Sequence, residues 1–198
     1  MHLQTLSSIR ELVFAGGMRR PAQLSLRLLA LAVLFVPSQD LFAQSPQASR
    51  IFEGQARIID GDTLEIGTQR IDLYGIDAPE PDQHCERDGR QWRCGMEATY
   101  GMAALIENHW VTCHEQASGT AGNAAANPLA VCRMGGPKGI IVNQRTVLRG
   151  WALALRPSGD DYVGAEQQAK GAKVGLWSGT FVAPWEWRRT RETGKTVN

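Results

Sequence analysis

The 198-residue sequence predicts one α+β domain: a five-stranded β-barrel with about three helices. Strand-like segments are concentrated in the first part of the domain. One amphipathic helix interrupts them, and further helices follow. Hydrophobic residues make up 43% of the chain, which suits a single core of ordinary size. We therefore expect one fold with extensions rather than two domains.

The N-terminal segment is typical of a secretory signal peptide. Two arginines precede an apolar run over residues 28–36, small Ala43 offers a cleavage point, and Met18 is the more natural start. Nine apolar residues cover only about half of a ~30 Å hydrocarbon core, so no stable membrane span is expected. The protein should be periplasmic or secreted, or membrane-anchored if the signal is kept. The expected organisation is a signal peptide over 1–43, a linker over 44–51, the domain over 52–188 and a basic flexible tail over 189–198.

Periodicity and breaks predict the elements of the domain in order. Residues 52–76 alternate apolar and polar side chains with breaks at "DGD" and "EIGTQ", which predicts three strands joined by tight turns. Apolar positions predict a helix over 97–108, despite the cost of Gly101. Strands around 110–114 and 129–133 should follow it.

Two more helices are predicted, within "IIVNQRTVLRGWAL" and "DYVGAEQQAKGAKVGLW". Before them, the small polar segment "HEQASGTAGNAAANP" predicts a mobile surface loop between the last two strands. The resulting order is that of a small Greek-key barrel of the oligonucleotide/oligosaccharide-binding kind, the OB-fold.

All four cysteines lie after the signal segment, and an even count in an exported domain is typical of disulfides. Their spacing favours Cys85 with Cys94 and Cys113 with Cys132, because each pair joins neighbouring segments. Zinc is the weaker alternative, since the spacings do not match the usual C-x2-C knuckles.

Two acidic motifs carry the chemistry, "DGDT" at 60–63 and "GIDAPE" at 75–80. If the first lies at a hairpin turn and the second ends a neighbouring strand, Asp62 and Asp77 converge on one hard cation such as Ca²⁺. Glu80 could then position or deprotonate an attacking water. The alternative is that these acids serve only turns and caps, for which both motifs are suitable.

Together with "CGMEA", "VNQRTVLRGWALAL" and "AKGAKVGLWSG", these motifs make the chain from about Gly54 to Trp187 resemble the staphylococcal nuclease (thermonuclease) family. The resemblance implies an OB-fold barrel that acts as a Ca²⁺-dependent phosphodiesterase on DNA and RNA. By matched position, it assigns metal ligation to the carboxylates of Asp62 and Asp77 and the carbonyl of Ala78, the role of general base to Glu80, and a supporting role to Asp60 and Thr63.

Two positively charged positions of the family are missing here. The first family arginine precedes the calcium aspartate by five residues, which is Asp72 in this chain, and the second corresponds to Asn127. The segment "QASGTAGNAAAN" before the last strand holds no Arg or Lys, and Leu153 and Leu155 stand where the family has tyrosines that flank a nucleotide. Arginines of this kind contribute on the order of 10³ to 10⁵ in rate. We therefore expect weak or lost nuclease activity.

The remaining sequence features leave alternatives open. The chain after residue 43 is nearly neutral, so any binding of nucleic acid should be weak. A non-catalytic module that binds an oligonucleotide, an oligosaccharide or a protein is the competing function. Arg70 could reach toward Asp72 and replace the missing positive charge. The basic stretch formed by Arg87, Arg90 and Arg93 could contact phosphate, but a solvated surface role is favoured for it.

The C-terminal tryptophans are expected to pin the tail to the core rather than to stack on ligands. They are Trp177, Trp185 and Trp187.

Overall fold

A computed structural model describes residues 49–116 and 127–194. The signal segment, most of the loop predicted between the last two strands, and the last four residues lie outside the described residues. Within the described ranges, no helix has the length and apolar character needed to cross a membrane.

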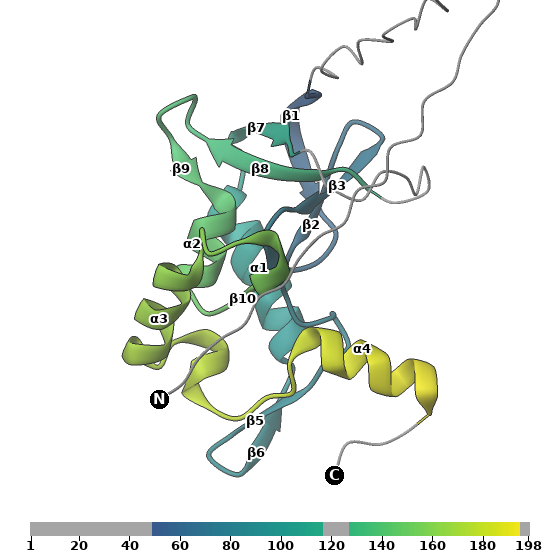
Figure 1. Cartoon of the computed structure of the whole chain (residues 1–198), viewed down its shortest axis with the longest axis vertical. Coiled ribbons are helices and arrows are strands. Elements are labelled where there is room, and N and C mark those ends of the chain that lie inside the picture. Colours follow the sequence, from purple (N-terminus) through teal and green to yellow (C-terminus); the bar gives the residue numbers. More distant parts are fainter. Residues whose placement is uncertain (1–48, 117–126, 195–198) are drawn as a thin grey trace, which may run out of the picture. The chain divides into compact units, whose positions relative to one another are not determined.

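A closed barrel of mixed strands forms the centre of the domain (Figure 1). Its strands follow the spatial order β3-β2-β1-β7-β8, and a parallel pairing between β3 and β8 closes the ring. A short strand, β9, extends the sheet beside β8. This confirms the predicted five-stranded OB-fold barrel. The strands are β1 (Ile51–Ile58), β2 (Thr63–Ile66), β3 (Gln69–Leu73), β7 (Trp110–Glu115), β8 (Leu129–Met134) and β9 (Ile140–Ile141).

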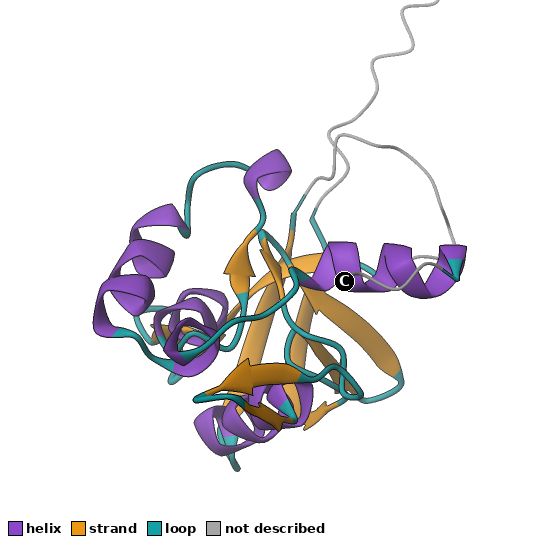
Figure 2. Cartoon of the chain, turned by 90° about the horizontal axis from the view of Figure 1, so that it is seen from below, coloured by secondary structure: helices purple, strands orange, loops and turns teal. Residues whose placement is uncertain are grey.

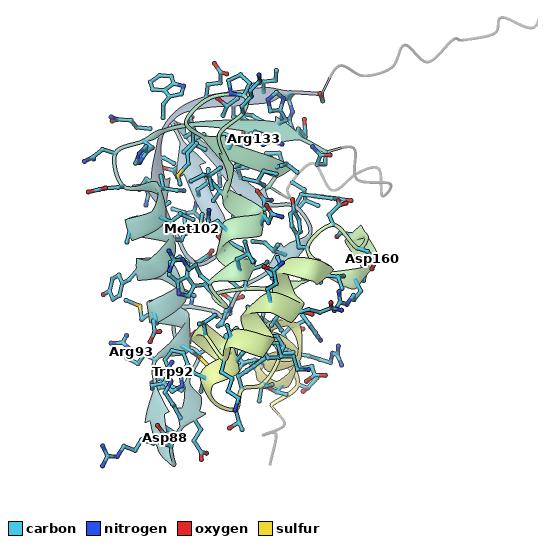
Figure 3. The ribbon with its side chains drawn as sticks, turned by 90° about the vertical axis from the view of Figure 1, so that its left-hand side faces the viewer. Asp88, Trp92, Arg93, Met102, Arg133 and Asp160 are labelled. Atoms are coloured by element: carbon cyan, nitrogen blue, oxygen red, sulfur yellow. A yellow bond between two sulfur atoms is a disulfide. The ribbon has the colours of Figure 1, made fainter. Side chains whose placement is uncertain are left out.

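The barrel strands bury alternate side chains, as their sequence pattern predicts. Leu64 and Ile71 are paired across β2 and β3, and neither is exposed to solvent. Helix α1 (Cys94–Ile106) packs on the barrel core through Met102 and Ile106, which are also fully buried (Figure 3). The glycine that weakens this helix in a sequence-based prediction, Gly101, lies directly against the ring of Trp151, where a larger side chain would clash.

Three further helices follow the barrel along the chain. Figures 1 and 2 show α2 and α3 on one side of the strands and α4 on the opposite side. Between α2 and α3, β10 (Leu153–Ala154) pairs with β4 (Ile76–Asp77). The helices are α2 (Val142–Leu148), α3 (Val163–Ala172) and α4 (Pro184–Thr193), with 3-10 turns η1 (Arg156–Ser158) and η2 (Gly175–Ser178).

Helix α2 is shorter than the predicted segment because the chain turns at Gly150. This glycine has φ of +71° and lies against the backbone carbonyl of Val174, so that neither the conformation nor the space suits another residue. The turn frees Leu153 and Ala154 to form β10.

Helix α4 differs from the basic flexible tail expected over 189–198. A buried proline, Pro184, occupies the start of the helix, where its missing N–H costs nothing. Gly194, in the left-handed conformation, ends it. Residues 189–193 are therefore helical, residues 195–198 lie outside the described range, and the flexibility expected of this tail stays a prediction.

The predicted disulfides, Cys85–Cys94 and Cys113–Cys132, are both present. Cys113 and Cys132 are direct cross-strand partners inside the barrel. The other bridge joins α1 to a hairpin that the sequence did not predict, formed by β5 (Cys85–Arg87) and β6 (Arg90–Trp92). Asp88 lies at the tip of this hairpin, at the opposite end of the domain from Arg133 in Figure 3.

Candidate functional site

The two acidic motifs meet where the β1–β2 turn contacts the corner between β3 and β4. The backbone carbonyl of Asp62 accepts a hydrogen bond from the N–H of Leu73 at 2.8 Å. The Asp62 carboxylate accepts one from the N–H of Ala78 at 2.7 Å. Gly61 lies so close to the Ala78 methyl group that any side chain at 61 would collide with it. The glycine of "DGDT" therefore lets the two motifs approach each other.

Asp60 shapes the turn that presents Asp62. Its carboxylate accepts hydrogen bonds from the backbone N–H groups of Asp62 at 3.1 Å and Thr63 at 2.6 Å. Burial of the Asp62 carboxyl, with the neighbouring charges of Asp60 and Asp77, raises the pKa of Asp62 well above its usual range. These contacts show Asp60 holding the turn, and the supporting role expected for it at a metal site stays a prediction.

Asp77 is held by the β4–β10 pairing, opposite Leu153, and is only 5% exposed. Its two carboxylate oxygens accept hydrogen bonds from Arg188 of α4, at 2.9 and 2.7 Å. The same guanidinium also donates to Glu80, at 2.9 Å. These hydrogen bonds to Asp77 and Glu80 raise the pKa of Arg188 above its ordinary value, so the side chain stays charged.

Arg188 is the site residue that sequence reasoning missed. The only signal for it was the aromatic and basic segment "FVAPWEWRR", which has no periodicity or motif that points toward the acidic turns. The contact spans 111 residues along the chain to Asp77, and only the tertiary structure reveals such a pairing.

The start of α1 fixes the backbone around Glu80. Gly95 is packed against the carbonyl group of Glu80 and the Cα of Pro81, and a Cβ at this glycine would overlap with them. The Glu80 carbonyl also accepts the N–H of Gln83 at 2.8 Å. The glycine of "CGMEA" therefore positions the segment that carries the expected general base.

Asp72 and Asn127, the two positions expected to correspond to the family's arginines, are in contact with each other. Asp72 accepts hydrogen bonds from the Thr63 hydroxyl and from the Asn127 amide, each at 3.0 Å. The backbone explains this geometry, because Asp72 pairs with Thr63 across β2 and β3 and with Leu129 across the parallel pair. Within residues 49–116 and 127–194, Thr63 and Asn127 are the hydrogen-bond partners of the Asp72 side chain, while its backbone N–H donates to the carbonyl of Pro128 at 3.0 Å.

Arg70 does not take the place of the missing arginine. Its Nε lies 3.7 Å from a carboxylate oxygen of Glu65, on the exposed face of the sheet. Glu65 also pairs with Arg57 at 2.7 Å. The row of Arg57, Glu65 and Arg70 is a surface ion-pair network, which contributes little to stability.

The donor set does not fit Ca²⁺ in this arrangement. Calcium needs six to eight oxygen ligands, yet both oxygens of Asp77 and one of Glu80 accept hydrogen bonds from Arg188. One oxygen of Asp62 is engaged by the Ala78 N–H. Across the described parts of the chain, no three acidic, histidine or cysteine side chains converge as a metal site would require.

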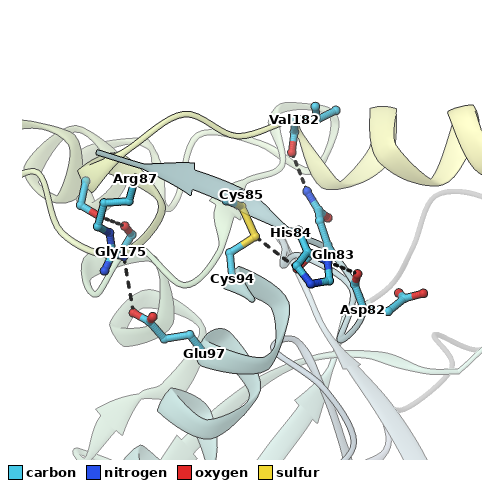
Figure 4. The surroundings of a disulfide bond; sticks show 10 residues. Asp82, Gln83, His84, Cys85, Arg87, Cys94, Glu97, Gly175 and Val182 are labelled. Atoms are coloured by element: carbon cyan, nitrogen blue, oxygen red, sulfur yellow. Dashed lines mark hydrogen bonds and ion pairs between the residues drawn. A yellow bond between two sulfur atoms is a disulfide. The ribbon is translucent and has the colours of Figure 1, made fainter. Parts of the chain in front are cut away.

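Of the basic stretch around the Cys85–Cys94 disulfide, Arg87 makes local contacts (Figure 4), whereas Arg90 and Arg93 are exposed. Arg87 lies over the ring of Trp92, 4.0 Å from its centroid, and 3.8 Å from a carboxylate oxygen of Glu97. His84 contacts the backbone carbonyl of Asp82 rather than a cysteine.

Trp177 and Trp185 pack on a core cluster, as the sequence predicted for the C-terminal tryptophans. Trp177 makes an edge-to-face contact with Phe181, with ring centroids 5.1 Å apart. Trp177 and Trp185 pack with the disulfide against Leu176. The guanidinium carbon of Arg191 lies over the ring of Trp187, 4.7 Å from the ring centroid.

A closed barrel of this strand order, with helices on two sides, defines an α+β protein of the OB-fold class. The model of the family described as "Staphylococcal nuclease homologue" matches residues 70–179. The chain belongs to this family.

Two curated proteins are similar to the chain. Protein ParB of Escherichia coli is 33% identical over 182 residues, which cover 87% of this chain and 95% of ParB. Succinoglycan biosynthesis protein ExoI of Rhizobium meliloti (strain 1021) is 34% identical over 103 residues, which cover 51% of this chain and 54% of ExoI. The chain therefore matches about half the length of ExoI but nearly all of ParB.

Proposed function

We propose that the chain is an exported member of the staphylococcal nuclease family whose phosphodiesterase activity is weak or lost. The observation that carries this proposal is the contact between Asp72 and Asn127, at the two positions where the family has arginines. An acid and a neutral amide that satisfy each other offer no positive charge to a phosphate. The two disulfides support the export part of the proposal, because such bonds form in oxidising compartments.

The expected loss of activity follows from the charge that phosphoryl transfer develops. An arginine that neutralises this charge contributes on the order of 10³ to 10⁵ in rate. Here Asp72 adds a negative charge beside the turn that carries Asp60 and Asp62, whereas the charge of Asp77 is already balanced by Arg188. Repulsion between carboxylate and phosphate therefore opposes both substrate binding and the transition state.

Hydrolysis of single-stranded DNA by the oxidised protein, with and without Ca²⁺, tests the proposal. We expect the rates of the wild type and of Glu80→Gln to be equal and close to the uncatalysed background. The control is Glu186→Gln, which removes an exposed carboxylate from α4. Calcium-dependent turnover far above the uncatalysed background that disappears in Glu80→Gln and persists in Glu186→Gln would refute the proposal.

A non-catalytic binding module is the second candidate function. It is favoured by the similarity to ExoI, which is named for the biosynthesis of succinoglycan, and by the use of OB-fold barrels for oligosaccharides as well as oligonucleotides. Titration with a neutral oligosaccharide and with single-stranded DNA, at low and moderate salt, distinguishes these ligands. A DNA affinity that falls steeply with salt indicates phosphate contacts and argues against the glycan.

A further inference from the structure

The guanidinium of Arg188 occupies the space between the carboxylates of Asp77 and Glu80. One nitrogen donates to both acids at 2.9 Å, and the other donates to the second oxygen of Asp77 at 2.7 Å. The Asp77 side chain is 6% exposed, whereas that of Arg188 is 41% exposed. A cation supplied by the protein itself therefore neutralises a buried carboxylate from the solvent side.

The element that delivers Arg188 is anchored at its start. The Gln83 side chain donates to the carbonyl of Val182 at 2.7 Å, immediately before α4 (Figure 4). Trp185 packs near the Cys85–Cys94 disulfide. One turn beyond Arg188, Arg191 forms an ion pair with Asp82. Contacts on both sides of Arg188 thus fix its position along the helix.

A divalent ion at this position would have to compete with the guanidinium. Both need the oxygens of Asp77, and their positive charges repel each other at short range. Metal binding would therefore require the Arg188 side chain to leave first. The apparent affinity for the metal ion then equals the intrinsic affinity multiplied by the fraction of molecules in which Arg188 has left.

We propose that Arg188 is a built-in cation that replaces the divalent metal ion at this site and keeps Ca²⁺ out. The inference rests on the proposed assignment of Asp77 and Glu80 to the family site. The inference concerns metal binding, whereas the proposed function concerns hydrolysis. An assay of bound calcium therefore tests the inference alone, and an assay of DNA hydrolysis tests the proposed function.

Calorimetric titration of the oxidised protein with Ca²⁺ tests this inference. We expect the wild type to bind Ca²⁺ no better than in the millimolar range. Arg188→Gln, which removes the charge, should bind at least about tenfold more tightly. The matched control is Arg189→Gln, an exposed arginine on the same helix, which should behave as the wild type. Equal calcium affinity in the wild type and Arg188→Gln would overturn the inference.

Thermal unfolding provides a second readout in case Arg188→Gln folds poorly. This variant leaves Asp77 without its counter-ion, so we expect a lower midpoint that Ca²⁺ raises. The double variant Asp77→Asn with Arg188→Gln removes both charges and should fold without responding to Ca²⁺. If Ca²⁺ neither binds to Arg188→Gln nor raises its midpoint, Arg188 does not stand in for a metal ion.

Discussion

Asp72 and Asn127, at the two positions expected to hold arginines, form a hydrogen bond with each other. Asp72 accepts hydrogen bonds from the Asn127 amide and the Thr63 hydroxyl, each at 3.0 Å. A hydrogen bond to a charged acceptor contributes more than one between neutral groups, typically about 1.5–3 kcal/mol, and less where water has access. Both residues are half-buried. The contact therefore stabilises the junction between β3 and the start of β8.

A double-mutant cycle measures this contact. Asp72→Ala and Asn127→Ala should each lower the free energy of unfolding, with a coupling energy of about 0.5–1.5 kcal/mol in urea denaturation. The control Gln168→Ala removes an exposed amide from α3 and should stay within about 0.5 kcal/mol of the wild type. Strict additivity of the two substitutions would show that the contact is energetically irrelevant.

The approach of α1 to the Glu80 segment is the tightest constraint on the site among its elements. Gly95 lies in the first turn of α1, and the Glu80 carbonyl and the Cα of Pro81 occupy the space that a side chain would need. Even a methyl group must push α1 away from the chain that carries Glu80. The position of Glu80 thus depends on a residue outside both acidic motifs.

Gly95→Ala should therefore destabilise the protein by about 2 kcal/mol, because overpacking against backbone cannot relax through a side-chain rotation. Gly164→Ala is the matched control, since Gly164 lies in α3 with open space around its Cα. This control should stabilise the protein by about 0.5–1 kcal/mol through helix propensity. Urea denaturation measures both changes. If Gly95→Ala is neutral, the close approach has no energetic role.

The barrel elements could be predicted from sequence, whereas the short hairpin and the last helix could not. In β1, β2 and β3 apolar and polar residues alternate in the sequence, and the turns between these strands contain glycine. The alternation and the glycine breaks therefore both predict strands here. The β5–β6 hairpin has strands of only three residues each, too short for a period, and a bridge from Glu86 to Thr180 supports it at long range. Helix α4 is rich in aromatic and basic residues, and its role depends on acids more than a hundred residues earlier.

The same limit applies to the site. The motifs predicted that "DGDT" and "GIDAPE" lie together, and the hydrogen bond from Ala78 to Asp62 agrees with this. The expected roles of Asp62, Asp77 and Glu80 in metal binding and catalysis remain predictions. Arg188 changes their interpretation, because a cation supplied from a distant helix leaves no trace in the local sequence.

On the scale of the whole molecule, Tyr162 joins the helical side to the barrel corner. It precedes α3 and packs its ring against Gly75, whose φ of +79° and close approach leave no room for a side chain. Burial of the phenol, with the nearby charge of Asp161, raises the pKa of Tyr162 to about 12. Ionisation of this phenol therefore opposes folding.

The raised pKa predicts a loss of stability at alkaline pH. The folded protein keeps the phenol proton up to about pH 12, whereas the unfolded chain releases it near pH 10. The contribution of the Tyr162 phenol to the free energy of unfolding is fully present below about pH 10. It is lost between about pH 10 and about pH 12, at about 1 kcal/mol per pH unit.

Urea denaturation between about pH 9 and about pH 11 measures this dependence. Tyr162→Phe should flatten it, while Tyr100→Phe should not, because Tyr100 is 65% exposed. An unchanged slope in Tyr162→Phe would contradict the assignment.

The position of Arg188 in the chain also has a consequence for folding. It follows Glu80 by 108 residues and lies beyond β10, the strand that pairs with β4 and holds Asp77. Contacts between distant parts of a chain form late, because closing a long loop costs entropy before any contact repays it. We therefore expect docking of α4 to be a late event in folding, and until then the carboxylate of Asp77 lacks its counter-ion and must stay in contact with water.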